Sequence, residues 1–305
     1  MAADDTWPSG AVGLQQGEYG DGSPLDGVHY LECKLILKPD RFTCVQDFHE
    51  YGSIVREAAQ QCEAGFSTKH MAQPKPGIRE VLFLDTEDFR FYNNAFILRR
   101  RTTYEDGFPV GDPEIVLKFR HPDLHTAAAV DVRPTIPGSY QIKFKAEALP
   151  LRDQLGGYRF LYSHNVQFGL SQAPAGDQTS MLTLARMFPA LEALKKSDSE
   201  RVELVNQAIV EEVLQDLGTV DFGKGVAADS DVALWRTRGE HKSLVGEFSF
   251  QLKFKRRSDL PEKSVERCKQ FYISLQSIAP DWVALGVTKT AMVYRLKGNP
   301  PQAHE

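Results

Sequence analysis

The chain has 305 residues, a hydrophobic fraction of 42%, and 36 Lys and Arg against 41 Asp and Glu, for a formal net charge of −5. This composition is that of a globular chain with a full core. No apolar run approaches the roughly 20 residues of a membrane-spanning helix. The first residues lack the basic and apolar regions of a secretory signal, so we expect a cytoplasmic protein with no membrane partner.

The first half of the chain alternates mainly between strand signals and turns. Residues 1–27 are rich in Gly, Asp and Ser and offer little to bury, which predicts a flexible N-terminal tail. A strand is predicted from Tyr30 to Lys38, and an apolar stripe at helical spacing follows between Thr43 and Gly65. Further strands are predicted near 81–84, 95–103, 114–120 and 140–148.

The second half begins with a predicted helical insertion at about 150–230. It contains a helix over 181–195 broken at Pro189, and a helix over 199–217 opened by a Ser197/Glu200 capping box and closed by Gly218. Strands at 231–237 and 245–256, a helix after Pro261, a last strand at 291–296 and a C-terminal tail at 298–305 complete the chain. The predicted fold class is α+β and β-dominated, an antiparallel barrel of about eight strands with helices packed outside.

The predicted strands share one charged face. In the first strand, Glu32 and Lys34 lie opposite Leu31 and Cys33, because successive strand side chains point to opposite sides. Over six such strands, twelve basic residues meet three Glu: Lys34, Lys38, Arg99, Arg101, Lys118, Arg120, Lys143, Lys145, Arg236, Arg238, Lys253 and Lys255 against Glu32, Glu147 and Glu247. A face that is only solvated should mix the two signs, as the rest of the chain does. This bias predicts an anionic ligand held against the sheet.

Three segments also carry the motifs of one family. Tyr30-Leu-Glu-Cys-Lys34, the block from Phe83-Leu-Asp-Thr86 to Leu98-Arg-Arg-Arg101, and Gly246-Glu-Phe-Ser-Phe-Gln251 occur in order along the chain. They resemble the Glu-x-Glu-x-Lys, Phe-Asp-Thr…Leu-Arg-x-Arg and Glu-x-Glu motifs of the CYTH superfamily, or triphosphate tunnel metalloenzymes. Members include class IV adenylyl cyclases, thiamine triphosphatases and inorganic triphosphatases. The resemblance covers about residues 28–297 and implies a single tunnel domain.

The resemblance implies roles for individual side chains. Lys34, Arg99, Arg101 and Lys118 would be catalytic, and Lys143, Lys145, Arg236, Lys253 and Lys289 would bind substrate. Glu32, Glu247 and Glu147 would hold Mg²⁺ or Mn²⁺, which prefer oxygen ligands. Two motif carboxylates are replaced, by Tyr30 and by Ser249, and this weakens the prediction of a metal.

The leading expectation is a metal-dependent phosphohydrolase acting on a small triphosphate or pyrophosphate. The replaced carboxylates keep open a non-catalytic binder or sensor of a phosphorylated ligand, and the family keeps open a nucleotide cyclase of the class IV type. Nucleic acid is not an expected partner, because aromatic side chains do not interleave on the basic faces. The sequence leaves open the organic part of the substrate and the oligomeric state.

Overall fold

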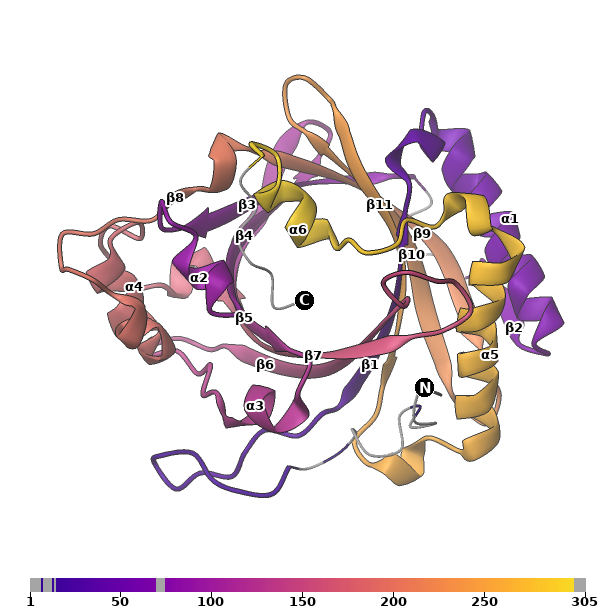
Figure 1. Ribbon diagram of the computed structural model, residues 1–305, viewed down its shortest axis with the longest axis horizontal. Helices are drawn as coiled ribbons and strands as arrows, with labels where there is room; N and C mark the ends of the chain where they lie inside the picture. The colour runs from indigo at the N-terminus through magenta and orange to yellow at the C-terminus, as the bar shows by residue number, and fades with distance from the viewer. Residues whose placement is uncertain (1–6, 8–12, 14, 70–74, 299–305) are drawn as a thin grey trace.

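In the computed structural model, which describes Trp7, Gly13 and residues 15–69 and 75–298, eleven strands join one sheet. Nine of them close into a barrel in the order β9-β10-β11-β1-β6-β7-β5-β4-β3, because β3 pairs back onto β9 (Figure 1). The barrel strands are β1 (Tyr30–Leu37), β3 (Gly77–Asp85), β4 (Phe96–Glu105), β5 (Phe108–His121), β6 (Gln141–Leu149), β7 (Arg159–Gly169), β9 (Val210–Asp221), β10 (Ala227–Thr237) and β11 (Ser243–Lys253). The short strands β2 (Gly65–Ser67) and β8 (Glu203–Leu204) extend the sheet beside β9 and β3.

The predicted fold class, a β-dominated barrel with helices outside, is confirmed. The helices are α1 (Val45–Gln61), α2 (Arg90–Asn93), α3 (Leu124–Ala129), α4 (Met181–Met187), α5 (Glu262–Ile278) and α6 (Lys289–Tyr294). One pairing departs from the prediction, because β1 runs parallel to β6 and the barrel is therefore mixed. A parallel pair needs a long connection, and the hundred or so residues between these two strands supply it.

Two predicted elements are wrong. The helix predicted over 199–217 is absent: its first part holds β8 and a short turn, and residues 210–217 belong to β9, which pairs with β10 on one side and β3 on the other, so two long-range ladders override the local capping signal. Within the described residues, the predicted helical insertion at 150–230 therefore contains mainly strands, with α4 as its one α-helix. The strand predicted over 291–296 is the helix α6, whose first turn is capped by the Thr288 hydroxyl accepting from the N–H of Ala291.

The helix α6 lies across one end of the barrel (Figure 1). Tyr294 stacks on Tyr92 with ring centroids 4.1 Å apart, and its hydroxyl donates to Asp85 Oδ2 at 2.9 Å. Asp85 also accepts from the backbone N–H groups of Phe91 and Tyr92, so this motif residue organises the chain at that end of the barrel. This arrangement places Lys289, the first residue of α6, inside the barrel.

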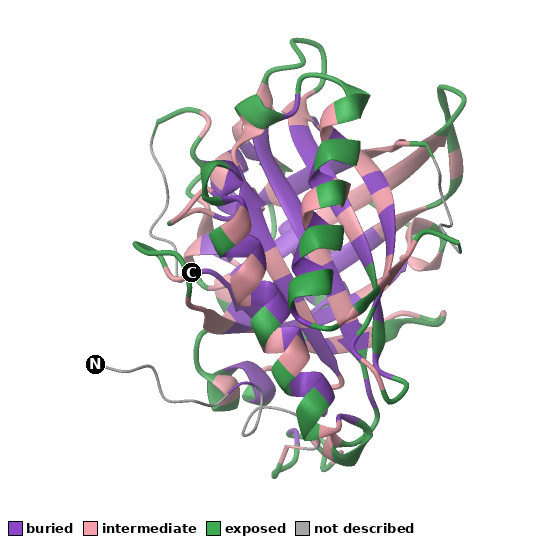
Figure 2. Cartoon of the chain, turned by 90° about the vertical axis from the view of Figure 1, so that its right-hand side faces the viewer, coloured by how far each residue is buried: buried purple, intermediate pink, exposed green. Residues whose placement is uncertain are grey.

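The main hydrophobic core lies outside the barrel. Leu31, Cys33 and Leu35 of β1 are fully buried in the same cluster as Tyr51 of α1 and Phe271 of α5. Figure 2 shows buried residues on the barrel wall behind these two helices. Because side chains alternate along each strand, an apolar outer face leaves the charged face of the same strands turned into the barrel.

The N-terminal segment contributes to this core. Trp7 is 6% exposed and packs against Tyr158, Phe160 and Tyr272 at ring distances of 4.5, 5.5 and 5.7 Å. Tyr19 is also buried. The prediction that residues 1–27 offer little to bury is therefore wrong at these two positions. The rest of the predicted tails at 1–6, 8–12, 14 and 299–305 lies outside the described residues. In the described part of the chain, no helix is long and apolar enough to cross a membrane.

Candidate functional site

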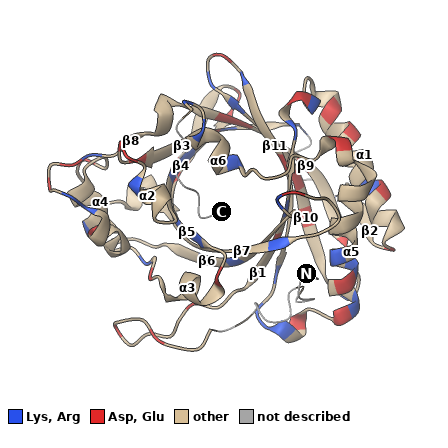
Figure 3. Cartoon of the chain, in the orientation of Figure 1, with Lys and Arg blue, Asp and Glu red and all other residues tan. Residues whose placement is uncertain are grey.

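The barrel encloses a cavity of about 260 Å³ whose lining is strongly charged. Among the described residues, nine basic and five acidic side chains line it: Lys34, Arg79, Arg99, Arg101, Lys118, Arg120, Lys143, Lys145 and Lys289, with Glu32, Glu147, Glu212, Asp231 and Glu247. Nine minus five gives a formal charge of +4 inside a chain whose net charge is −5. Figure 3 shows basic residues on the strands around the central opening.

Most of the side chains predicted for the site converge on this cavity. They are Lys34, Arg99, Arg101, Lys118, Lys143, Lys145, Lys289, Glu32, Glu147 and Glu247. Arg236 and Lys253 do not line it. Asp231, Ala233 and Trp235 of β10 line the cavity, so alternation turns Arg236 to the outer face, where it pairs with Glu211. Lys253 is exposed at the end of β11, with its Nζ 5.9 Å from the Tyr30 ring.

The sequence predictions missed several cavity residues. Arg79 lies on the same face of β3 as Val81 and Phe83, and strand alternation could have identified it as an inward residue. Glu212 belongs to β9, which was predicted to be a helix. Asp231, from β10, shares the inward face with Trp235, whereas the sequence prediction put Arg236, of the opposite parity, on the charged face.

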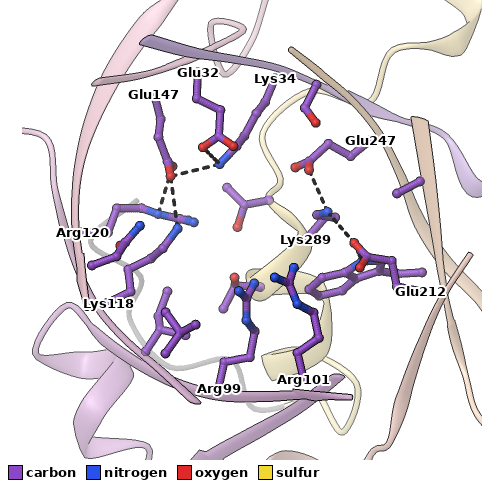
Figure 4. Close-up of a pocket in the computed structure, with 18 of the residues that line it drawn as sticks. Glu32, Lys34, Arg99, Arg101, Lys118, Arg120, Glu147, Glu212, Glu247 and Lys289 are labelled. Atoms are coloured by element: carbon purple, nitrogen blue, oxygen red, sulfur yellow. Dashed lines mark hydrogen bonds and ion pairs between the residues drawn. The ribbon is translucent and has the colours of Figure 1, made fainter. Parts of the chain in front are cut away.

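A first ammonium group bridges two carboxylates from neighbouring strands. The parallel register places Glu32 of β1 beside Glu147 of β6. Lys34 Nζ lies 2.9 Å from Glu32 Oε2 and 3.0 Å from Glu147 Oε1 (Figure 4). Burial alone would lower the pKa of Lys34, but the two carboxylates outweigh burial and raise it. We call this group the first ammonium bridge.

Glu147 is the most enclosed charge of the site. Its side chain is 1% exposed and contacts Lys118 Nζ at 3.1 Å and Arg120 Nε at 3.3 Å in addition to Lys34. Burial would raise the pKa of Glu147, but these cations hold it well below its usual range. Burial and the neighbouring Arg120 and Lys34 lower the pKa of Lys118 to about 7, against the opposing pull of Glu147. Three cations therefore share one carboxylate, and positive charge is in excess at this wall.

A second ammonium group bridges two carboxylates from β9 and β11, farther round the barrel. Lys289 Nζ, from α6, lies 2.7 Å from Glu247 Oε1 and 3.3 Å from Glu212 Oε1 (Figure 4). It also lies 4.7 Å from the centroid of the Trp235 ring, whose Nε1–H donates to Glu212 Oε1 at 2.9 Å. Glu212 further pairs with Arg79 at 2.8 Å. We call this group the second ammonium bridge.

Two guanidinium groups of β4 point into the space between the bridges (Figure 4). Arg99 and Arg101 are two residues apart and share a strand face, and both approach Glu114, at 3.6 and 2.8 Å. Burial and the neighbouring Arg101 lower the pKa of Arg99 to about 10. The buried Nε–H of Arg99 donates to no atom of the described residues. A planar guanidinium fork with a free donor suits phosphate oxygens.

Apolar side chains form one end of the cavity, next to α6. Ile36, Phe83, Ile97, Leu149 and Trp235 come from five strands, line the cavity and are each less than 5% exposed. We call these five residues the apolar floor.

The donor set does not fit a divalent metal. No group of three or more His, Cys, Asp or Glu side chains within the described residues is arranged to hold one. Each carboxylate predicted as a ligand, Glu32, Glu147 or Glu247, is already engaged by an ammonium group within about 3 Å. Mg²⁺ takes about six oxygen ligands, several of them waters or phosphate oxygens, but one or two carboxylates must anchor it, and each of the three predicted ones contacts an ammonium group here.

No family model and no curated protein matches the sequence. Among solved structures, the chain is similar to a Hippeastrum candidate adenylyl cyclase described as having a dominant triphosphatase activity, with 13% identity over 91% of this chain and 100% of that one and a TM-score of 0.41. It is also similar to a candidate adenylate cyclase from Bacillus halodurans, with 10% identity over 89% and 98% and a TM-score of 0.40. A protein from Pyrococcus horikoshii aligns with 14% identity over 86% and 96% and a TM-score of 0.34. The barrel described above is itself a strand tunnel with a charged interior, the fold that the resemblance to the CYTH superfamily implies.

Proposed function

We propose that the cavity binds a small anion that carries several negative charges, of the triphosphate or pyrophosphate class. The observation that carries this proposal is the enclosed charge of +4 in a chain that is net acidic. Like charges confined in a poorly solvated space repel one another, and a polyanion relieves that repulsion. Burial, together with the cationic neighbours Arg120 and Lys34, lowers the pKa of Lys118, because a neutral lysine avoids both desolvation and repulsion.

The geometry of the lining supports a phosphate ligand. Arg99 and Arg101 present guanidinium forks from one wall, and Lys118 presents a compact charge from the next strand of the barrel, β5. Arginine binds phosphate through paired, charge-assisted hydrogen bonds, and lysine binds it as a point charge. The cavity of about 260 Å³ is slightly below the usual 300–1,000 Å³ of sites that enclose drug-sized ligands. It suits an inorganic oligophosphate or the phosphate end of a larger molecule.

A single strand offers the test and its matched control. Arg99→Gln removes an inward guanidinium, whereas Arg100→Gln removes the next residue, which lines a small cavity on the outer wall with Leu98 and Met187. Calorimetry at low salt should show tripolyphosphate binding to the wild type and to the Arg100 variant with similar affinity. The Arg99 variant should bind about 10- to 100-fold more weakly, the value of a hydrogen bond to a charged group. The proposal fails if tripolyphosphate does not bind, or if both variants lose affinity equally.

Hydrolysis of the bound ligand is a second candidate function. Lys34, Arg99 and Lys118 come from three strands and surround one space, an arrangement that can neutralise charge developing on a leaving phosphate. Phosphate release from tripolyphosphate, measured with EDTA, with Mg²⁺ and with Mn²⁺, tests this candidate. If no condition releases phosphate while calorimetry shows binding, the protein is a binder or sensor and not a hydrolase.

A further inference from the structure

The two ammonium bridges have the same composition, a lysine held between two glutamates. Lys34 lies between Glu32 and Glu147, and Lys289 lies between Glu212 and Glu247. Two carboxylates that face each other across a gap of a few ångströms commonly hold a divalent cation. In this tunnel an ammonium group stands in each gap.

The surroundings of each bridge favour the ammonium group over a metal. Glu32 and Glu147 carry two negative charges, but Lys34, Lys118, Arg120 and Lys145 contact them with four positive charges. A divalent cation approaching this cluster meets net positive charge, and it would have to displace a lysine that is only 11% exposed. The displaced ammonium would then be buried without its two partners.

At the second bridge, Lys289 contacts an aromatic ring in addition to its two carboxylates. The Trp235 ring centroid lies 4.7 Å from Lys289 Nζ. An ammonium group gains a cation–π interaction there, whereas a hydrated divalent ion would need oxygen ligands that an indole ring does not supply. At the two positions where the family motifs have further carboxylates, this chain has Tyr30 and Ser249, which contribute a ring and a hydroxyl.

We propose that the Lys34 and Lys289 ammonium groups take the places of divalent cations, so that the tunnel binds its phosphate ligand without a metal ion. This inference rests on the proposed function for its ligand, but it makes a separate statement about metal. The positive charge that a metal would bring to the phosphate is supplied instead by side chains of the chain itself.

The first experiment compares tripolyphosphate affinity with and without metal. The full chain is treated with EDTA, dialysed, and titrated with tripolyphosphate by calorimetry in EDTA, in Mg²⁺ and in Mn²⁺. The affinity in EDTA should equal or exceed that in either metal, because a metal ion competes for the free anion. Binding that is lost in EDTA and restored by Mg²⁺ or Mn²⁺ would overturn the inference.

A second experiment measures metal binding without any phosphate. Lys289→Gln leaves Glu212 and Glu247 facing each other without their ammonium group, whereas Lys289→Arg keeps a cation there. Free Mn²⁺, followed by its paramagnetic resonance, should bind at least tenfold more tightly to the Gln variant than to the wild type or the Arg variant. Lys242→Gln, at an exposed turn, is the surface control.

These two experiments separate failure of the inference from failure of the proposed function. Wild-type protein that binds Mn²⁺ as tightly as the Lys289→Gln variant refutes the inference, whatever tripolyphosphate does. If tripolyphosphate binds under no condition, the proposed function fails, and the Mn²⁺ titration still decides whether ammonium groups replace the metal.

Discussion

Glu147→Gln is the most informative single change in the tunnel. The substitution keeps the size of the side chain and removes the one negative charge that Lys34, Lys118 and Arg120 share at 3.0, 3.1 and 3.3 Å. Lys34 retains Glu32, but the other two cations lose the carboxylate that they contact. The variant therefore isolates the cost of enclosing uncompensated positive charge.

The contacts set the magnitude of the effect. Removing one partner of a buried ion pair costs about 3–5 kcal/mol of unfolding free energy. For a chain of this size, each kcal/mol lowers Tm by roughly 2 °C, so we expect a decrease of about 6–10 °C at pH 7. Cations hold the pKa of Glu147 below its unfolded value of about 4.3. Its stabilisation is therefore present above that pH and is lost as pH falls through the folded pKa, so the wild type and the variant should converge in acid.

Thermal unfolding followed by circular dichroism gives the measurement. Glu192→Gln is the matched control, because Glu192 pairs with Lys195 at the surface and such pairs contribute about 0–1 kcal/mol. Tripolyphosphate should raise the Tm of the Glu147 variant more than that of the wild type, since the anion supplies the missing negative charge. A Glu147 variant as stable as the Glu192 control would refute the account of a charge-crowded tunnel.

Three further predictions concern other parts of the molecule. Trp7→Ala should lower the free energy of unfolding in urea by about 3–5 kcal/mol, because it empties a buried aromatic contact, and an unchanged midpoint would show that the N-terminal segment does not support the core. Burial and the neighbouring Asp216 raise the pKa of Asp231 to about 6, so its ionisation costs stability as pH rises from about 4 through 6. Asp231→Asn should therefore exceed the wild type in Tm at pH 8 but not at pH 4, and equal differences at both pH values would contradict this reasoning. Because the apolar floor crowds one end of the cavity, a triphosphate esterified at both ends should not stabilise the protein while tripolyphosphate does, and equal thermal shifts would show that the floor is no barrier.

The sequence by itself determined most of the strands and the side on which their charges lie. Alternation along β1, β4, β5 and β6 predicted both the strands and the inward direction of Lys34, Arg99, Lys118 and Lys145. Strand periodicity is a local property of the backbone, and the hydrophobic effect selects which face meets the core, so both can be inferred from neighbouring residues.

Only the tertiary structure decided which strands pair and therefore which charges meet. The parallel register of β1 and β6 brings Glu32 beside Glu147, although 114 positions separate them along the chain. The helix α6 places Lys289 between two glutamates, and the inward direction of Trp235 leaves the next residue, Arg236, on the outer face. Long-range pairing also turned the C-terminal part of the predicted helix at 199–217 into β9. Pairing and register depend on contacts between distant segments, and no local pattern of residues encodes them.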